Sequence, residues 1–485
     1  MLCRSTRRRG GPGPSATRRL GIWPLAVGAL VAPVTAQETE PEIDGKWAGS
    51  VVLPAGELPF SVTFETTDGV LSATMDIPVQ GALGLPLAAV SFADGRVHFE
   101  LEASIGLAVW DGALDGDRIE GEFTQGAASG TFSVMRAQED AEAEEPAEPV
   151  PYREEEISFE NGEIHLEGTL TLPEGDGPFP AVLLITGSGP QDRDEVVFGF
   201  PVFKVLSDHL TRQGIAVLRY DDRGVGGSTG SVSGSTTSDF AGDALAGIAR
   251  LSEHPDVDPS RVGLLGHSEG AVVAPLAASR SDAVRFVVLL AGSTVPGTEI
   301  LYEQSAAIAR AAGAPEDRIA WNTDFQRRLF AAMEAGADLE TFREELGVAI
   351  REGIDDLSEE QRAPISDVDS YVQTQVEAEI DRLETPWFRH FLTYDPVPAL
   401  RETRVPVLAL FGGLDLQVLP DQNRGPLEAA LGGNPDVTVE VLPRANHLFQ
   451  TATTGSPAEY AMLGHTFVDG FLDTISDWIL ARFGN

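Results

Sequence analysis

The sequence contains a single cysteine, Cys3, and only two lysines, Lys46 and Lys204. Cys3 lies before an N-terminal apolar segment that we expect to be removed, so the remaining chain should contain neither a disulfide nor a thiol nucleophile. Positive charge is also scarce, since 34 basic residues face 75 acidic ones and the formal net charge is −41. Because a chain this acidic repels phosphate backbones, binding to nucleic acid through charge is excluded.

The apolar run near the N-terminus is short for a membrane span. Residues 1–36 contain six arginines and no acidic residue, and the run covers residues 20–34 with two prolines inside it. Its length of about 15 residues is below the roughly 20 of a transmembrane helix, and it ends in Val34-Thr35-Ala36. These features predict a signal peptide over residues 1–36, export to the periplasm or the extracellular space, and no stable membrane insertion. An uncleaved anchor is the alternative, and Thr17-Arg18-Arg19-Leu20 leaves the export route open between the general and the twin-arginine pathway.

The length of 485 residues exceeds what one ordinary core supports, so we expect two folded domains. Across residues 43–136, short alternating runs are separated by turns such as Asp115-Gly116-Asp117. About six to eight strands at this spacing predict an antiparallel β barrel or sandwich. We expect Trp47 and Trp110 in its core, although they could line a ligand mouth, and ligand or glycan docking stays open as its role. The candidate strands are residues 62–64, 70–75, 97–101, 108–114, 119–123 and 131–135.

An acidic segment, residues 137–152, follows this domain. It is rich in Glu, Ala and Pro and nearly free of bulky apolar side chains, which predicts an extended linker. Residues 153–485 then alternate buried apolar runs with amphipathic segments, as in an α/β domain. An antiparallel pair at 157–159 and 164–172 should precede parallel strands and helices. We predict parallel strands at residues 181–186, 215–220, 262–266, 285–290, 405–411 and 437–442, helices at 203–211, 241–251, 271–279 and 458–482, and a helical lid near 298–400.

A Gly-x-Ser-x-Gly sequence, Gly266-His267-Ser268-Glu269-Gly270, joins the predicted strand 262–266 to the predicted helix 271–279. A serine hydroxyl becomes a useful nucleophile when a sharp turn holds it exposed near a base. We therefore predict Ser268 as the nucleophile and the N–H of Glu269, at the helix start, as an oxyanion donor. A plain glycine-rich turn is the alternative interpretation.

Two further candidates follow the last two predicted strands. Asp415 ends Gly412-Gly413-Leu414-Asp415, and His447 ends Arg444-Ala445-Asn446-His447. Open α/β sheets place their sites at the carboxyl ends of parallel strands, so we predict His447 as the base and Asp415 as the acid that orients it. The alternatives are Asp421 for the acid and His390 or His465 for the base.

A second oxyanion donor is predicted at the N–H of Ser188, because glycines flank it in the turn Gly187-Ser188-Gly189-Pro190 after a strand. A simple loop is the alternative there. The turn Asp221-Asp222-Arg223-Gly224-Val225-Gly226-Gly227-Ser228 also follows a strand, and we predict that it ties loops together without touching substrate.

These motifs together resemble the α/β-hydrolase superfamily, in particular secreted bacterial carboxylesterases of the EstD-like, serine-aminopeptidase-like group. The resemblance covers about residues 155–485 and rests on Gly187-Ser188-Gly189-Pro190-Gln191-Asp192-Arg193-Asp194, the Asp-x-Arg-Gly-x-Gly-x-Ser turn, Gly-His-Ser-Glu-Gly, Asp415 and His447. It implies an α/β-hydrolase fold, with a mostly parallel sheet and a helical lid insertion, preceded by the small antiparallel β domain. The family's usual His-Gly is Thr186-Gly187 here, which removes a side chain that often braces the oxyanion loop.

The motifs predict a serine hydrolase that cleaves short or medium acyl esters, small-molecule substrates, through an acyl-enzyme, with no cofactor or metal. A peptidase or amidase on the same residues is the alternative, and it would usually need an acidic anchor for a substrate amino group. The insertion offers candidates for that anchor in Glu334, Glu340, Glu344 and Glu345. A binding protein with an inactive hydrolase fold is a third interpretation, which the intact serine, aspartate and histidine oppose.

Overall fold

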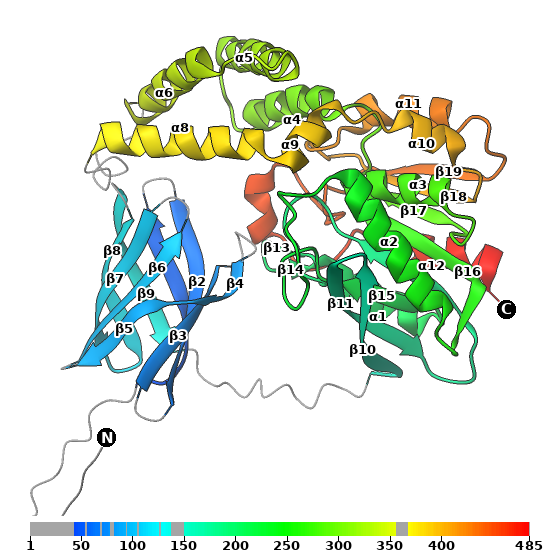
Figure 1. The fold of residues 1–485 in the computed structure, drawn as a ribbon, viewed down its shortest axis with the longest axis horizontal. Helices are drawn as coiled ribbons and strands as arrows, with labels where there is room; N and C mark the ends of the chain where they lie inside the picture. The colour runs from blue at the N-terminus through cyan, green and yellow to red at the C-terminus, as the bar shows by residue number, and fades with distance from the viewer. Residues whose placement is uncertain are drawn as a thin grey trace, which may run out of the picture. The chain divides into compact units, whose positions relative to one another are not determined.

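The computed structural model of the protein describes residues 43–53, 56–67, 70–77, 82–93, 95–103, 106–125, 128–136, 150–355 and 367–484 (Figure 1). The predicted signal peptide, residues 1–36, lies outside the described residues, and so do residues 137–149 of the predicted linker. Among the residues that the structure describes, no helix has both the length and the apolar composition to cross a membrane.

The N-terminal domain is one antiparallel sheet in the order β4-β3-β2-β1-β9-β8-β7-β6-β5. The two ends of this order, β4 and β5, are separated in sequence only by Leu87, whose N–H donates to the carbonyl oxygen of Ala73 in β3 at 3.0 Å. The sheet therefore curls round until its two edges meet in one bent segment, which makes it a barrel (Figure 1). The strands are β1 Gly45–Leu53, β2 Gly56–Thr67, β3 Val70–Ile77, β4 Ala82–Pro86, β5 Ala88–Ala93, β6 Arg96–Ala103, β7 Gly106–Asp115, β8 Arg118–Gln125 and β9 Ala128–Arg136.

Three of these strands, β1, β4 and β5, are absent from the sequence prediction. Glycines interrupt the alternation of apolar residues in β1 and β4, and β5 is mostly alanine and other small residues. Gly49 in β1 is nevertheless required by packing, since a Cβ there would lie 2.0 Å from the carbonyl oxygen of Ser133. Trp47 and Trp110 are 0% and 3% exposed, and Trp110 stacks on Phe99 with ring centroids 5.2 Å apart. Both tryptophans thus belong to the barrel core, as expected.

The C-terminal domain is an eight-stranded sheet in the order β10-β11-β15-β12-β16-β17-β18-β19. The first two strands are antiparallel, as predicted, and the strands from β15 to β19 are parallel. A two-stranded ribbon, β13 Val196–Val197 and β14 Phe200–Pro201, precedes the first helix. The sheet strands are β10 Tyr152–Asn161, β11 Ile164–Pro173, β12 Phe179–Ile185, β15 Ala216–Tyr220, β16 Val257–His267, β17 Val287–Leu290, β18 Val407–Gly412 and β19 Val437–Leu442.

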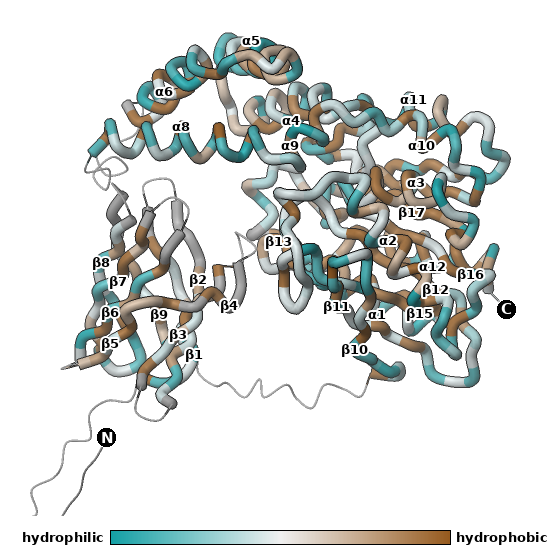
Figure 2. The backbone as a smooth tube through the Cα atoms, viewed as in Figure 1, coloured by the Kyte–Doolittle hydropathy of each residue, from teal (hydrophilic) through white to brown (hydrophobic). Residues whose placement is uncertain are grey.

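Helices cover both faces of this sheet. Helices α1 (Val202–Arg212) and α12 (Phe471–Phe483) share a buried apolar cluster with one face. On the opposite face, α2 (Thr237–Ser252), α3 (Gly270–Arg280), α10 (Val397–Glu402) and α11 (Pro420–Ala430) pack in a second cluster. Because both faces are covered, β12, β17 and β18 contain no polar side chain, and much of the sheet is coloured brown (Figure 2).

The helical insertion between β17 and β18 forms as predicted and has a hydrophobic cluster of its own. It contains α4 Gly297–Ala311, α5 Glu316–Glu334, α6 Glu340–Asp355, α8 Val368–Glu384 and α9 Pro386–Thr393. The final helix is shorter than predicted, because the expected helix 458–482 is interrupted. A 3₁₀ turn, Pro457–Met462, is followed by a loop that ends at Gly470, whose φ of 83° does not fit a right-handed helix, and α12 begins only afterwards.

Candidate active site

Ser268 lies between β16 and α3 in a strained turn. Its φ is 53°, in the left-handed region that residues with side chains rarely adopt. A Cβ on Gly266 would lie 2.0 Å from the carbonyl oxygen of Gly270, and a Cβ on Gly270 would lie 2.1 Å from that of Ile185. Both glycines are therefore needed for the close approach of strand and helix that presents Ser268 above the sheet.

Asp415 and His447 meet at the same edge of the sheet, on the loops after β18 and β19. The Nδ1 atom of His447 is 2.8 Å from Oδ2 of Asp415, and both side chains are buried. The other carboxylate oxygen of Asp415 accepts the backbone N–H groups of Gln417 and Val418 at 2.7 and 2.9 Å. Asp415 is thus held in one orientation and in turn fixes the ring of His447.

The alternative acid and bases lie elsewhere. Asp421 is exposed in the first turn of α11. His390 lies in α9, and His465 stacks on Phe200 with ring centroids 6.0 Å apart. None of these three described residues lines the cavity that Ser268 and His447 share.

That cavity has a volume of about 420 Å³. Ser268, His447 and the loop residues Gly187 and Ser188 lie on its floor, and the helical insertion supplies much of its wall. The apolar residues that the insertion and its flanks contribute include Ile300, Leu301, Trp387, Phe388 and Phe391. The arrangement gives a reacting carbonyl an apolar compartment next to a serine hydroxyl.

The predicted oxyanion donors lie beside Ser268. A Cβ on Gly187 would be 3.3 Å from the Cβ of Ser268, so the turn that carries Ser188 packs directly against the serine. Within residues 150–355 and 367–484, the N–H groups of Ser188 and Glu269 donate to no acceptor. Two unoccupied N–H groups next to a nucleophile are suited to stabilising a negative oxygen.

The side chain of Glu269 is buried under the insertion. Its carboxylate accepts Nε1–H of Trp387 in α9 at 2.9 Å and the hydroxyl of Thr237 at 3.0 Å. Burial raises the pKa of Glu269, and the hydrogen bonds from these two side chains offset the effect only in part. Glu269 therefore connects the turn beside Ser268 to the helical insertion.

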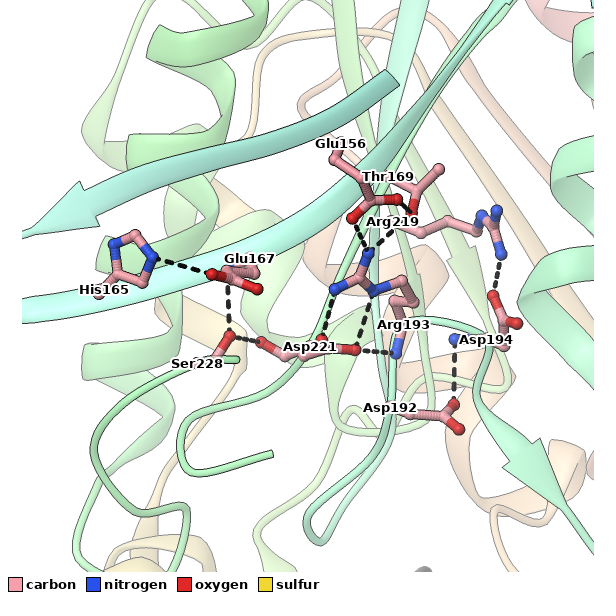
Figure 3. Close-up of polar contacts among 10 residues, drawn as sticks. All are labelled: Glu156, His165, Glu167, Thr169, Asp192, Arg193, Asp194, Arg219, Asp221 and Ser228. Atoms are coloured by element: carbon pink, nitrogen blue, oxygen red, sulfur yellow. Dashed lines mark hydrogen bonds and ion pairs between the residues drawn. The ribbon is translucent and has the colours of Figure 1, made fainter. Parts of the chain in front are cut away.

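The loop that carries Ser188 is anchored by charged residues outside the cavity (Figure 3). The guanidinium of Arg193 makes a two-pronged contact with the buried Asp221, at 2.7 and 3.1 Å, and also donates to Glu156 and Thr169. Arg219 pairs with Asp194 in the same loop. The turn that contains Asp221 thus ties loops together, in agreement with its predicted structural role.

The loop lacks the usual bracing histidine at Thr186, and other contacts hold it. The Thr186 hydroxyl and the backbone N–H of Gln191 donate to Asp222 at 2.8 and 3.0 Å. The N–H of Gly187 donates to the carboxylate of Glu195 at 2.8 Å. Glu195 is not among the predicted site residues, because the charged run from Asp192 onward gives no signal that distinguishes one of its members.

His267, the residue before Ser268, is buried and contacts two other loops. Its Nδ1 atom is 2.8 Å from Oε1 of Glu195, and its Nε2 atom is 3.0 Å from the carbonyl oxygen of His447. These contacts span 72 and 180 residues of sequence, so no local pattern could have revealed them.

Several known proteins are similar to this chain in sequence or in structure. Residues 182–462 match the alpha/beta hydrolase family. Esterase EstD of Thermotoga maritima is 30% identical over 362 residues, which cover 73% of this chain and 74% of the relative. A Pyrococcus furiosus esterase structure has 15% identity and a TM-score of 0.42, covering 69% of this chain and 93% of its own. The α/β hydrolase GrgF from Penicillium sp. sh18 has 16% identity and a TM-score of 0.42, covering 69% and 100%.

Proposed function

This chain belongs to the α/β-hydrolase family and is a hydrolase of the esterase type, and from that premise we propose that Ser268, His447 and Asp415 form its catalytic triad. One observation carries the proposal. Ser268 is held at a φ of 53° in a cavity that it shares with His447, whose ring is fixed by the buried Asp415 at 2.8 Å. A strained serine that lines the same cavity as a histidine oriented by a carboxylate is suited to acyl transfer.

The proposed reaction has two halves. His447 takes the proton from the Ser268 hydroxyl as the serine oxygen attacks the ester carbonyl carbon, and the N–H groups of Ser188 and Glu269 stabilise the oxyanion. When the carbon–oxygen bond to the leaving group breaks, His447 returns the proton to the alcohol. Water, activated by the same histidine, then attacks the acyl-enzyme and releases the acid and free Ser268.

The cavity supports small-molecule esters with a short to medium acyl chain. Its volume of about 420 Å³ and its aromatic and aliphatic wall suit an apolar acyl group. The four insertion acids that a peptidase could use as an anchor, all of them described residues, do not line this cavity. Glu345, for example, pairs with Arg328 at 2.7 Å. Ester cleavage is therefore the better supported activity.

The triad is tested with single and double variants on a short p-nitrophenyl ester. Ser268→Ala and His447→Ala should each remove nearly all turnover, and the double variant should be little worse, because members of one catalytic unit are not additive. A double variant whose loss equals the product of the two single losses would contradict a single unit. Aminoacyl anilides assayed alongside a series of esters separate amidase from esterase activity, and turnover of neither class would favour a binding protein.

A further inference from the structure

Glu195 is a buried carboxylate that the proposed acyl transfer does not use. Its side chain is 1% exposed, and its φ of 48° is strained for a residue with a side chain. Oε1 accepts two hydrogen bonds at 2.8 Å, from the N–H of Gly187 and from Nδ1 of His267. Oε2 has no partner among the described residues. A strained and incompletely paired carboxylate beside a reaction centre calls for a functional explanation.

His267 extends this contact to the loop of the base. A carbonyl oxygen can only accept a hydrogen bond, so the Nε2 atom of His267, at 3.0 Å from the carbonyl of His447, must carry a hydrogen. Burial alone would lower the pKa of His267, but the charge of Glu195 and the hydrogen bonds to Glu195 and His447 outweigh it and raise the pKa above 6.5. Both nitrogens of His267 thus face oxygen atoms, and the raised pKa favours the form of the ring that can donate from both.

Glu195 and His267 together connect three loops whose relative positions must stay fixed for acyl transfer. Gly187 precedes the oxyanion donor Ser188, His267 precedes Ser268, and the carbonyl of His447 belongs to the base itself. The bond from the N–H of Gly187 to Glu195 is one of the contacts that hold the oxyanion loop. The rings of His267 and His447 are also close, with centroids 4.9 Å apart.

We propose that Glu195, acting through Gly187 and His267, is a positioning residue that fixes the oxyanion donor relative to His447. The proposal rests on the proposed function of Ser268 and His447. Glu195 lies at the cavity wall, but only 1% of its side chain is exposed, so its loss should slow the chemical step and leave substrate binding nearly unchanged. A misplacement of about 1 Å can cost roughly 100-fold in rate.

The test measures kcat and KM of the full-length protein on a short p-nitrophenyl ester. Glu195→Ala should lower kcat by about 10- to 100-fold with KM changed by less than about threefold. Glu195→Gln should lose less, because its amide oxygen can still accept the N–H of Gly187, and His267→Phe should resemble the alanine variant. The matched control is Asp243→Asn, which weakens a buried pair with Arg223 (2.7 Å). Among the described residues, neither member of this pair hydrogen-bonds to the oxyanion loop or to His447. Circular dichroism shows that each variant is folded.

Several outcomes would overturn the proposal. A Glu195→Ala enzyme within about twofold of wild-type kcat, alongside an inactive Ser268→Ala, would show that Glu195 positions nothing. A kcat loss no larger than that of Asp243→Asn would reduce its role to general stability, and a raised KM with unchanged kcat would mean that Glu195 binds substrate. Turnover by Ser268→Ala would instead remove the proposed function, and the positioning role with it.

Discussion

The contact between Arg193 and Asp221, which anchors the oxyanion loop, leads to a quantitative prediction about stability. In Arg193→Ala, the side chain of Asp221, only 6% exposed, would lose the two-pronged guanidinium contact. Breaking a buried pair by removing one partner costs about 3–5 kcal/mol, because the remaining charge is left buried. The backbone N–H of residue 193 still donates to Asp221 at 2.8 Å, so we expect the lower end, about 3 kcal/mol.

An exposed ion pair in the same protein supplies the control. Arg328 contacts Glu345 at 2.7 Å, but the two side chains are 42% and 32% exposed. Solvent screens such pairs, so Arg328→Ala should destabilise the protein far less than Arg193→Ala. Arg193→Lys should fall between the two, because a lysine ammonium cannot reproduce the two-pronged geometry.

The assay is urea unfolding of each variant at neutral pH, followed by far-ultraviolet circular dichroism and by loss of esterase activity. Activity should be lost before the global transition in Arg193→Ala, because the loop that carries Ser188 and Glu195 loses its anchor while the sheet remains intact. The reasoning is refuted if Arg193→Ala is destabilised no more than Arg328→Ala, since Asp221 would then not depend on Arg193.

Three further predictions concern the insertion, the barrel and pH. Trp387→Phe removes the N–H that donates to Glu269. The preference for acyl chain length across a p-nitrophenyl ester series should then change while a small ester is still cleaved, and an unaltered preference would contradict a lid role for the insertion. A chain that starts near Pro151 should fold and keep its kcat on a short ester, because the barrel has a separate core; a folded truncation with more than about a tenfold loss would mean that the barrel braces the site. The pKa of His267 is raised in the folded protein, which contributes stability that is fully present below about pH 6.5 and is lost as the pH rises through the raised pKa. The free energy of unfolding, measured by urea titration, should therefore fall over that pH range, and it should fall less in His267→Phe.

Local sequence determined the turn at Ser268 and the elements on either side of it. At Gly266 and Gly270, an added Cβ would lie about 2 Å from a backbone oxygen, so these positions accept little other than glycine. The apolar runs likewise indicate the strands of the parallel sheet, because a strand covered on both faces is mostly apolar. Ser268, Asp415 and His447 each follow the end of one of these strands, so their place at one edge of the sheet could be predicted from the sequence.

Only the tertiary structure decided which side chains meet across those loops. Periodicity describes neighbours in sequence, whereas Glu195 and His267 are 72 residues apart, and His267 and the His447 carbonyl 180 residues apart. The same holds for the bond between Trp387 and Glu269, across 118 residues, which depends on how the insertion folds back. Such contacts form after the sheet has brought its loops to one edge, and they depend on the packing of the whole domain rather than on any segment of it.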